Sequence, residues 1–294
     1  SKPRFAVRIT PDMDADAVLA AVNKVDYDRI GERMYAEIVY VNCDAEATAD
    51  KYVALVQKAA ALGRTLILGC SDPEIAKAAL EVCKDNKPVL NGANASNYEA
   101  MNAVATAAGV VLGVSGKDLN ELYDTTAAIE KLGNKNLVLD VTGADIKETF
   151  GNAVQVRRAA LKDQDRTFGY PSIVNLAKIA GGDYHLQAGL AAMFTMKYGS
   201  IVVMERMTYA EALPLYGLRQ NVFTDPQKPM RVEPGIYPMN GGDENSLVVT
   251  TVDFALTYFL VSGELERSGV PLNLVINDAG GLSVLTSWAA GKFS

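Results

Sequence analysis

Cysteine, histidine and tryptophan are scarce in this chain. Its 294 residues include three cysteines, one histidine and one tryptophan. Three thiols cannot hold an iron–sulfur cluster that needs four, and Cys43, Cys70 and Cys83 lie too far apart for a Cys-x-x-Cys metal site. We expect all three to be reduced, buried thiols in a cytoplasmic protein.

Long apolar runs and basic clusters are also missing. No apolar run reaches the roughly 18 residues that span a bilayer, and the first ten residues lack the organisation of a signal peptide. The net charge of −7 argues against nucleic-acid or acidic-membrane partners, because no basic stretch exists to neutralise phosphates. What is present, 49% hydrophobic and 21% charged residues, is typical of a soluble globular protein with a large core.

Short, β-rich apolar runs recur through the first 219 residues. Their continuous valine, isoleucine and leucine content predicts buried parallel strands rather than strands with one wet face. The eight runs are Phe5–Thr10, Ile38–Asn42, Thr65–Cys70, Pro88–Asn91, Val110–Val114, Leu137–Val141, Thr167–Val174 and Ile201–Met204. Eight strand–helix units are the number in a (β/α)8 TIM barrel, which we predict for residues 1–219 in preference to an open doubly wound sheet.

Helix start and stop signals separate these runs. Two pairs have the spacing of a capping box, in which side chains satisfy free amides at a helix start: Ser96 with Glu99, and Thr208 with Glu211. Four glycines stand where a left-handed residue would end a helix before the next strand: Gly63, Gly109, Gly133 and Gly199.

The pattern changes after residue 219. Prolines punctuate residues 220–245, which we predict to be a mostly extended connector, at Pro226, Pro229, Pro234 and Pro238. Residues 246–294 then alternate strand, helix, strand and helix: Leu247–Thr251, Ala255–Ser268, Leu272–Asn277 and Leu282–Phe293. Two parallel strands leave large apolar faces uncovered, so we expect a partial doubly wound domain and a segment of a longer polypeptide.

Ligands of parallel sheets bind beyond the carboxyl ends of the strands. The loops predicted there carry small hydroxyl groups, glycines and the free amides of a helix start, which suit a bulky, flat ligand with polar side arms. The candidate binding residues are Thr250, Thr251, Asp253, Phe254, Asp278, Gly280, Gly281 and Ser283. A glycine turn that merely connects strand to helix would give the same pattern. We assign no catalytic and no metal-ligating residue.

A family resemblance adds to this pattern. The stretch "VVTTVDFALTYFLVSGELERSGVPLNLVINDAGGLSVLTSWAAGKF" resembles the start of the corrinoid-binding domain of the corrinoid iron–sulfur protein large (gamma) subunit, from the acetyl-CoA synthase/CO dehydrogenase (acetyl-CoA decarbonylase/synthase) system. The preceding "LPLYGLRQNVFTDPQKPMRVEPGIYP" resembles the connector of that family. The resemblance implies a methyl carrier of the reductive acetyl-CoA pathway, which moves a methyl group from methyl-tetrahydropterin to the nickel site of acetyl-CoA synthase.

The same resemblance implies cofactors and partners. The cofactors are a cobamide, of which this segment would hold only part, and a [4Fe–4S] cluster on an upstream four-cysteine domain. The partners are a small subunit that completes a heterodimer, a methyl-pterin methyltransferase, and acetyl-CoA synthase/CO dehydrogenase. The family pattern has asparagine after the paired threonines, where this chain has Val252 and Asp253.

The only histidine stands in "GGDYHLQAGL", which approaches the corrinoid motif Asp-x-His-x-x-Gly. Asp183 and His185 fit the motif, but the sixth position is Ala188 and the glycine follows at Gly189. We interpret Asp183 as the N-cap of a helix.

Other polar groups leave an alternative function open. Asparagine, aspartate, threonine and glutamate gather at the predicted carboxyl ends of the barrel strands, where barrel enzymes carry catalytic residues: Asn42, Asn91, Asn94, Asp140, Thr142, Asn175 and Glu205. We favour a solvated rim, with a barrel-rim enzyme such as a pterin-dependent methyltransferase or aldolase-like lyase as the alternative. In "GVSGKDL" we predict Ser115 as a helix cap rather than part of a phosphate loop, and Trp288 as a core or interface aromatic.

Overall fold

The chain divides into two compact units. The computed structural model describes residues 2–43, 48–223 and 230–292. One unit comprises Ser1–Asp26 with Tyr35–Val222, and the other comprises Tyr27–Met34 with Phe223–Ser294. Within the described ranges, no helix is both long enough and apolar enough to cross a membrane.

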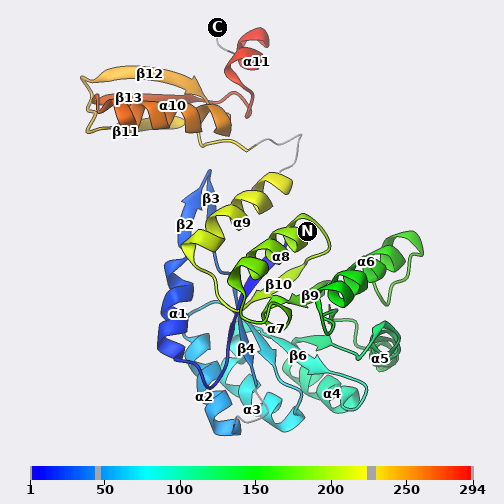
Figure 1. Ribbon diagram of the computed structural model, residues 1–294. Helices are drawn as coiled ribbons and strands as arrows, with labels where there is room; N and C mark the ends of the chain where they lie inside the picture. Colours follow the sequence, from blue (N-terminus) through cyan, green and yellow to red (C-terminus); the bar gives the residue numbers. More distant parts are fainter. Residues whose placement is uncertain (1, 44–47, 224–229, 293–294) are drawn as a thin grey trace. The chain divides into compact units, whose positions relative to one another are not determined.

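The first unit is a closed barrel of eight parallel strands, as the sequence predicts (Figure 1). Around the barrel the strands follow the order β1, β10, β9, β8, β7, β6, β5, β4. Their bounds are β1 (Arg4–Ile9), β4 (Ile38–Asn42), β5 (Thr65–Gly69), β6 (Val89–Ala93), β7 (Val111–Val114), β8 (Leu137–Asp140), β9 (Ser172–Asn175) and β10 (Ile201–Met204). Each predicted run contains or overlaps one strand. The run predicted from Thr167 starts too early, because β9 begins only at Ser172.

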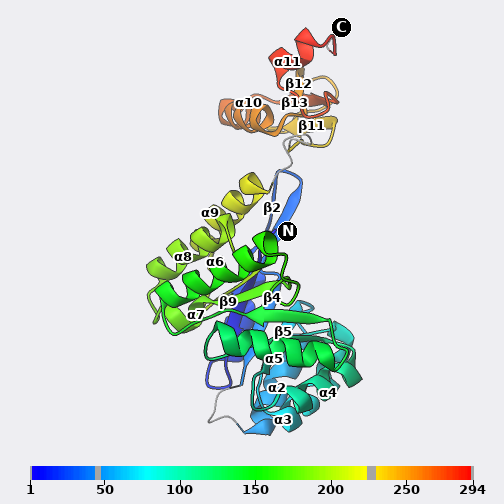
Figure 2. The ribbon, with the colours of Figure 1, turned by 90° about the vertical axis from the view of Figure 1, so that its right-hand side faces the viewer.

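Helices lie outside these strands (Figures 1 and 2). They are α1 (Ala15–Lys24), α2 (Ala49–Ala60), α3 (Pro73–Cys83), α4 (Tyr98–Ala108), α5 (Leu119–Lys131), α6 (Ile146–Lys162), α7 (Leu176–Ile179), α8 (Tyr184–Met196) and α9 (Tyr209–Val222), with a 3-10 turn η1 (Lys84–Asn86). Aspartate is the usual N-cap, and its carboxylate accepts backbone N–H bonds at Asp14, Asp72, Asp118, Asp145 and Asp183. A carboxylate there also complements the positive end of the helix dipole.

Two of the predicted helix starts are wrong. The Oδ1 atom of Asn94 accepts hydrogen bonds from the amide and hydroxyl of Ser96, so Ser96 forms no capping box with Glu99. Ser115 is not a cap either, because its hydroxyl donates to the carbonyl of Ala93 and Asp118 caps α5. Ser96 therefore bonds within its own loop, and Ser115 bonds to the end of the neighbouring strand β6, in place of the predicted caps.

The start of α9 keeps the predicted link between Thr208 and Glu211. The Glu211 carboxylate accepts from the amide of Thr208 at 2.7 Å and from its hydroxyl at 2.9 Å. This is the glutamate half of a capping box.

Three of the four predicted stop glycines are left-handed, with φ of 72° at Gly63, 66° at Gly109 and 91° at Gly133. Gly199 is not, because the left-handed residue is Tyr198, with φ of 69°. Glycine is needed at 199 for a different reason: a Cβ atom there would lie 2.5 Å from the carbonyl oxygen of Phe194.

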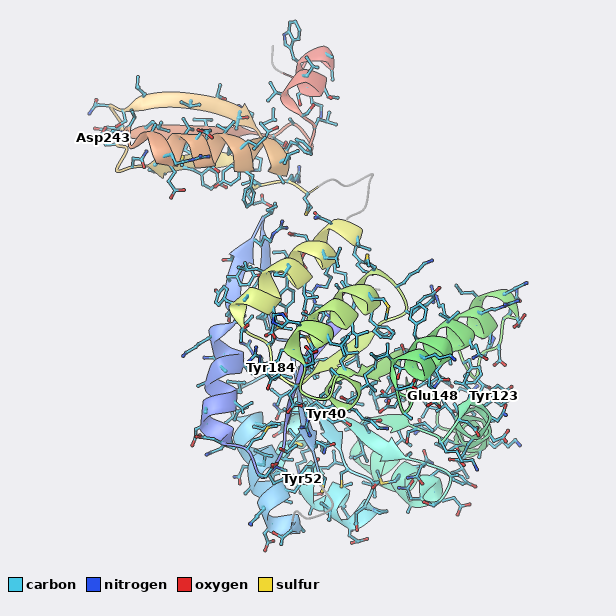
Figure 3. The ribbon with its side chains drawn as sticks, in the orientation of Figure 1. Tyr40, Tyr52, Tyr123, Glu148, Tyr184 and Asp243 are labelled. Atoms are coloured by element: carbon cyan, nitrogen blue, oxygen red, sulfur yellow. The ribbon has the colours of Figure 1, made fainter. Side chains whose placement is uncertain are left out.

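The barrel is filled by side chains that point inward from alternate strand positions. One buried cluster comprises Ala6, Ile38, Tyr40, Ile67, Val138, Ile173 and Val203. Tyr40 lies among the barrel strands (Figure 3) and is 4% exposed. Its burial, with the nearby Asp140 carboxylate, raises the pKa of the phenol well above its usual value.

A buried ion pair links Arg219 of α9 to Glu37, the residue before β4. The Nη1 atom of Arg219 lies 2.5 Å from Oε1 of Glu37, and the two side chains are 3% and 7% exposed. Arg219 also donates to the carbonyl of Pro3, and Glu37 accepts from the amide of Phe5. The guanidinium lies 4.5 Å from the ring centre of Tyr216, a cation–π contact.

The second unit contains a three-stranded sheet of order β11-β13-β12. Its elements are β11 (Gly235–Met239), β12 (Leu247–Val252), α10 (Ala255–Ser268), β13 (Leu272–Asn277) and α11 (Val284–Ala289). The two predicted strand–helix units are present, with β12 parallel to β13. Part of the predicted connector is instead a strand, because β11 pairs antiparallel with β13. Pro226 and Pro229 lie outside the described residues.

The sequence also failed to predict a hairpin between α1 and β4. It consists of β2 (Asp26–Arg29) and β3 (Glu32–Tyr35), joined by Ile30 and Gly31, both with positive φ. Two left-handed residues match a tight hairpin turn. These strands are polar, so a search for apolar runs does not detect them.

Candidate functional site

The eight candidate binding residues gather at one edge of the second unit's sheet. Parallel β12 and β13 end together, with Val252 opposite Asn277. The loop Asp253–Phe254 and the loop Asp278–Ser283 therefore follow neighbouring strands at the same edge. This confirms the placement that parallel strands predict, and it leaves ligand binding as a proposal.

Asp253 joins these two loops. Its side chain is fully buried, and Oδ1 accepts from the amides of Ala279 and Gly281, both at 3.0 Å. The amide of Asp253 donates to the carbonyl of Asn277. Asp253 therefore fixes the backbone of the glycine loop, and its carboxylate Oδ1 accepts both of these bonds.

Arg231 approaches the same carboxylate from the segment before β11. Its Nη1 lies 3.6 Å from Oδ2 of Asp253 and 3.3 Å from Oδ1 of Asp278. Oδ2 of Asp253 accepts no hydrogen bond from the described residues. The ion pair supplies the compensating charge that a buried carboxylate requires.

The candidate residues differ in what they present to solvent. Thr251, Asp253 and Gly281 are buried, and Phe254 and Ser283 are half-buried. The exposed members are Thr250, Asp278 and Gly280. Fewer residues are therefore open to a ligand than the sequence predicts, because the buried candidates pack beneath the loops.

Gly280 is an open point of this surface. Its φ is +66°, and a Cβ atom placed there would contact only the Nζ atom of Lys292, at 3.5 Å, among the described atoms. The bare backbone lets another molecule lie close to the peptide plane. The following helix start is capped by Ser283, whose hydroxyl accepts from the amide of Thr286.

Sequence reasoning missed Asn277 and Arg231. Asn277 donates through Nδ2 to Oγ1 of Thr250 and to the carbonyl of Thr251 at 2.9 Å, and so fixes the end of β12. An amide at the last position of a strand was a readable signal. No sequence signal indicated Arg231, because it lies 47 residues from its contact Asp278 in the sequence.

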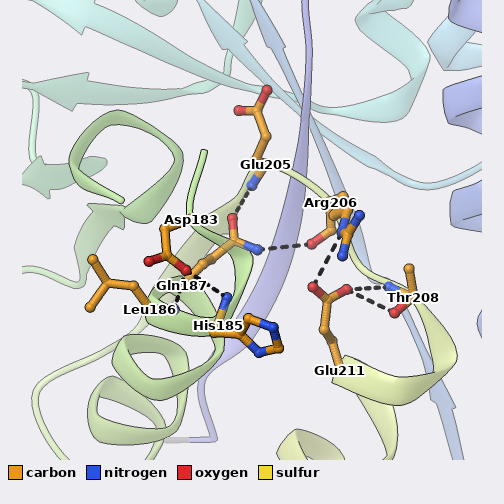
Figure 4. A network of polar contacts seen from close by, with 8 residues as sticks. All are labelled: Asp183, His185, Leu186, Gln187, Glu205, Arg206, Thr208 and Glu211. Carbon is orange, nitrogen blue, oxygen red and sulfur yellow. Dashed lines mark hydrogen bonds and ion pairs between the residues drawn. The ribbon is translucent and has the colours of Figure 1, made fainter. Parts of the chain in front are cut away.

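His185 lies in the barrel unit, at the start of α8 (Figure 4). Oδ1 of Asp183 accepts from the amides of His185 and Leu186, both at 3.0 Å, which confirms Asp183 as the N-cap. Gln187 donates to the carbonyl of Arg206. The near-match to a corrinoid motif is thus accounted for by a helix start.

Trp288 and Cys43 are less buried than a core position requires. Trp288 is 70% exposed on α11, so of its two predicted roles the core role is wrong and the interface role stays a prediction. Cys70 and Cys83 are buried as predicted, whereas Cys43 is half-buried, and none of the three forms a disulfide bond within the described residues. Among the described residues, no group of three or more histidine, cysteine, aspartate or glutamate side chains could hold a metal ion.

Known structures share the barrel. Dihydropteroate synthase from Thermus thermophilus superposes with a TM-score of 0.54 and 15% identity, over 76% of this chain and 95% of the other. The enzyme from Vibrio fischeri gives 0.53 and 14%, over 76% of this chain and 92% of the other. At such identities the likeness concerns the fold alone.

Closer relatives are known by sequence. The "Corrinoid/iron-sulfur protein large subunit" of Moorella thermoacetica is 37% identical over 292 residues, which cover 98% of this chain and 65% of that protein. The "Acetyl-CoA decarbonylase/synthase complex subunit gamma" of Methanothermobacter thermautotrophicus is 30% identical, over 99% of this chain and 66% of that protein. The chain thus spans about two thirds of the length of these relatives. Residues 2–294 match the family described as "CO dehydrogenase/acetyl-CoA synthase delta subunit", and the chain belongs to that family.

Proposed function

We propose that this chain is part of a corrinoid-dependent methyl carrier, with the edge formed by the loops after β12 and β13 as part of the cobamide site. One observation carries the proposal: Asp253 holds the glycine loop in place from below, so that Gly280 presents bare backbone outward. Family membership supports the cofactor, because the relatives' names include corrinoid/iron–sulfur protein.

The residues at this edge fit a large, flat group with amide side arms. Thr250 and Asp278 are exposed and supply a hydroxyl and a carboxylate for hydrogen bonds at the rim. Gly280 supplies a surface without a side chain. When bound, the cobamide supplies a cobalt atom that accepts a methyl group and gives it up again, so the protein's task is binding and access rather than acid–base chemistry.

The sheet order suggests where the rest of the cobamide domain attaches. β12 is an edge strand, and Leu247 and Val248 on it are 67% and 66% exposed. An exposed apolar edge favours pairing with a further strand. In a doubly wound sheet of this order the ligand crevice lies beside the first strand, here β12. We infer that a further parallel strand pairs with β12 and completes the crevice.

The wider assignment follows the family. Methyl-tetrahydropterin on its methyltransferase would supply the methyl group, and the nickel site of acetyl-CoA synthase would receive it. A small subunit would complete the heterodimer, and a [4Fe–4S] cluster would lie outside the residues described. Cys43, Cys70 and Cys83 are fewer than the four thiolates that such a cluster needs.

Two glycines with the same positive φ provide the test. Gly280 and Gly269 both have φ of +66°, but Gly269 ends α10 before the amino end of β13, whereas Gly280 lies beyond its carboxyl end. Gly280→Val and Gly269→Val therefore both place a β-branched residue at the same positive φ, and only the first adds a side chain to the proposed surface. Cobalt content and the corrinoid absorbance would be measured on the protein purified from a cobamide-producing host.

We expect Gly280→Val to lose cobalt and Gly269→Val to retain it, with equal circular dichroism. Cobalt retained in both variants would contradict the proposed surface. Equal loss from both would assign the effect to backbone strain and would contradict it as well.

A further inference from the structure

Two of the three cysteines stand at the ends of neighbouring barrel strands. Cys43 follows β4 and Cys70 follows β5, and the register of these strands pairs Asn42 with Gly69. The amide of Cys43 donates to the carbonyl of Gly69 at 2.7 Å, so the ladder continues by one residue and places Cys43 opposite Cys70. Two cysteines that are far apart in the sequence are thus neighbours in the sheet.

This pair has the spacing and orientation that a disulfide needs. Neighbouring strands lie about 4.8 Å apart, within the Cα–Cα range of about 4.4–6.8 Å that disulfides span. Tyr40 and Ile67, each three positions earlier, point into the barrel, so Cys43 and Cys70 both point outward. Both affect the buried phenol of Tyr52 on α2 (Figure 3), and the Cys70 thiol is hydrogen-bonded to the Cys43 side chain.

The backbone around Cys70 is fixed by the next strand. Its amide donates to the carbonyl of Asn91 at 3.0 Å. Its own carbonyl oxygen packs against Gly92, where a Cβ atom would lie only 1.9 Å away. The sheet therefore sets the separation of the two cysteines, and joining their sulfurs requires side-chain rotation rather than movement of strands.

Access from solvent differs between the two thiols. A pocket of about 440 Å³ at the carboxyl-end mouth of the barrel has Cys43 and Cys70 in its wall. Cys43 is half-buried, whereas Cys70 is 3% exposed, so a small reagent in the pocket meets Cys43 first. Five of the predicted rim residues line the same pocket: Asn42, Asn91, Asp140, Thr142 and Asn175.

Cys83 differs from this pair. It is 2% exposed on α3, and its thiol donates to the carbonyl of Ala79 in the same helix at 3.2 Å. It is not among the described residues that line the pocket. Cys83 therefore serves as the internal control.

We propose that Cys43 and Cys70 form a reversible disulfide when the protein meets a small-molecule disulfide, with Cys43 as the attacking thiol and Cys70 as the resolving thiol. The Cys43 thiolate attacks the reagent, the S–S bond of the reagent breaks, and one small thiolate leaves. The Cys70 thiolate then attacks the Cys43 sulfur, the second small thiolate leaves, and the Cys43–Cys70 bond forms. The two protons of the protein thiols pass through solvent to the two small thiolates, so the reagent is reduced as the pair is oxidised.

Burial explains the two roles. It raises the pKa of the Cys70 thiol to about 12, so little thiolate forms there to attack a reagent in solution. Once the mixed disulfide is on Cys43, its sulfur lies beside Cys70, and this proximity compensates for the scarce thiolate. The site is independent of the proposed cobamide surface, because both cysteines belong to the barrel unit.

Glutathione disulfide tests the pair in the unmodified chain. The reduced protein is incubated with it in the absence of oxygen, alkylated and digested, and linked peptides are identified by mass spectrometry. We expect a Cys43–Cys70 link with Cys83 alkylated, so that the free thiols fall from three to one and return with dithiothreitol. A lasting glutathione adduct on Cys43 without the link, a link to Cys83, or three thiols still free would overturn the proposal.

Cys70→Ala and Cys83→Ala are a matched pair of variants, because each removes a buried thiol. Cys70→Ala should retain glutathione on Cys43 at least about tenfold longer than the wild type, since the resolving thiol is absent. Cys83→Ala should form the link as the wild type does. Equal adduct lifetimes in Cys70→Ala and the wild type would contradict the role of Cys70.

Cys43→Ser keeps the roles testable if Cys70→Ala fails to fold, because position 43 is only half-buried. In this variant we expect glutathione disulfide to leave Cys70 and Cys83 as free thiols, with the circular dichroism of the wild type. A glutathione adduct on Cys70 would contradict the assignment of Cys43 as the attacking thiol.

Discussion

The two units of the chain differ in how much of their large apolar side chains they leave exposed. The barrel unit leaves three large aliphatic side chains more than half exposed among its described residues: Leu132, Leu161 and Met196. The much smaller second unit leaves eight large apolar side chains more than half exposed within 230–292: Ile236, Leu247, Val248, Leu256, Phe259, Leu260, Leu285 and Trp288. The barrel covers its own core, whereas the second unit carries apolar surface suited to further contacts.

Strand pairing explains this difference. Every barrel strand has a neighbour on both sides, so no hydrogen-bonding edge remains. Among the described strands of the second unit only β13 has two neighbours, and its buried residues Leu272, Leu274 and Ile276 form a small cluster. A unit with one central strand buries less area per residue and gains less stability from it. We therefore expect the two units to respond differently to substitution.

The largest expected effect is in the barrel. Arg219→Met removes the guanidinium and leaves Glu37 buried without its closest cation, which should lower the free energy of unfolding by about 3 kcal/mol. Arg4, 3.3 Å from Glu37 but more than half exposed, compensates only in part. Urea denaturation, monitored by hydrogen exchange in the barrel strands β1 and β4–β10, measures the loss.

Lys58→Met is the control in the same unit. It breaks an exposed pair with Asp16 at 2.8 Å, which should cost less than about 1 kcal/mol. Equal decreases in the free energy of unfolding of the two variants would show that the buried Arg219 pair contributes no more to stability than an exposed pair.

The next effect is in the second unit. Leu274→Ala truncates a fully buried side chain in the central strand and should lower the free energy of unfolding by about 2 kcal/mol. This value is near the lower limit for such changes, because the partly exposed neighbours Tyr237 and Tyr258 can move into the cavity. Hydrogen exchange should accelerate in β11–β13 and stay unchanged in the barrel strands β1 and β4–β10. Leu285→Ala, at a position 73% exposed, should change neither. Faster exchange in the barrel strands would mean that the units do not unfold independently.

The same comparison explains which elements the sequence could predict. The barrel strands are continuous apolar runs such as Ile38–Asn42, and their burial on both faces makes that pattern reliable. β11 was missed because Pro238 marks a connector by composition, although an edge strand tolerates proline. The hairpin β2–β3 was missed because its strands are polar and its turn places Ile30, a β-branched residue, at positive φ.

The candidate surface was predictable in position and not in detail. Parallel strands with aligned carboxyl ends placed the loops together, and the glycines of the second loop could be read directly. The burial of Asp253 and its bonds to Ala279 and Gly281 could not, since they join residues 26 and 28 positions apart in sequence. Likewise, the pairing of Cys43 with Cys70 emerges only when β4 and β5 lie side by side.

The smallest expected effect is a difference in reactivity among the three cysteines, all of which belong to the barrel unit. Burial raises the pKa of the Cys70 thiol to about 12 and that of Cys83 to about 11. The thiolate is the reactive form, so both should react slowly with N-ethylmaleimide at pH 8, while half-buried Cys43 reacts first. Mass spectrometry of timed samples measures the order, and Cys43→Ser should remove the fast phase.

The two buried thiols also link the stability of the barrel to pH. Unfolding returns them to the ordinary thiol pKa of about 8.5. Their folded-state pKa values are higher, so their contribution is fully present below about pH 8.5 and declines as the pH rises toward 11 to 12. The free energy of unfolding should therefore fall more steeply above pH 8.5 in the wild type than in Cys70→Ala/Cys83→Ala. Equal pH dependence, or labelling of Cys70 as fast as Cys43, would show that the barrel opens to solvent as readily as the second unit is expected to.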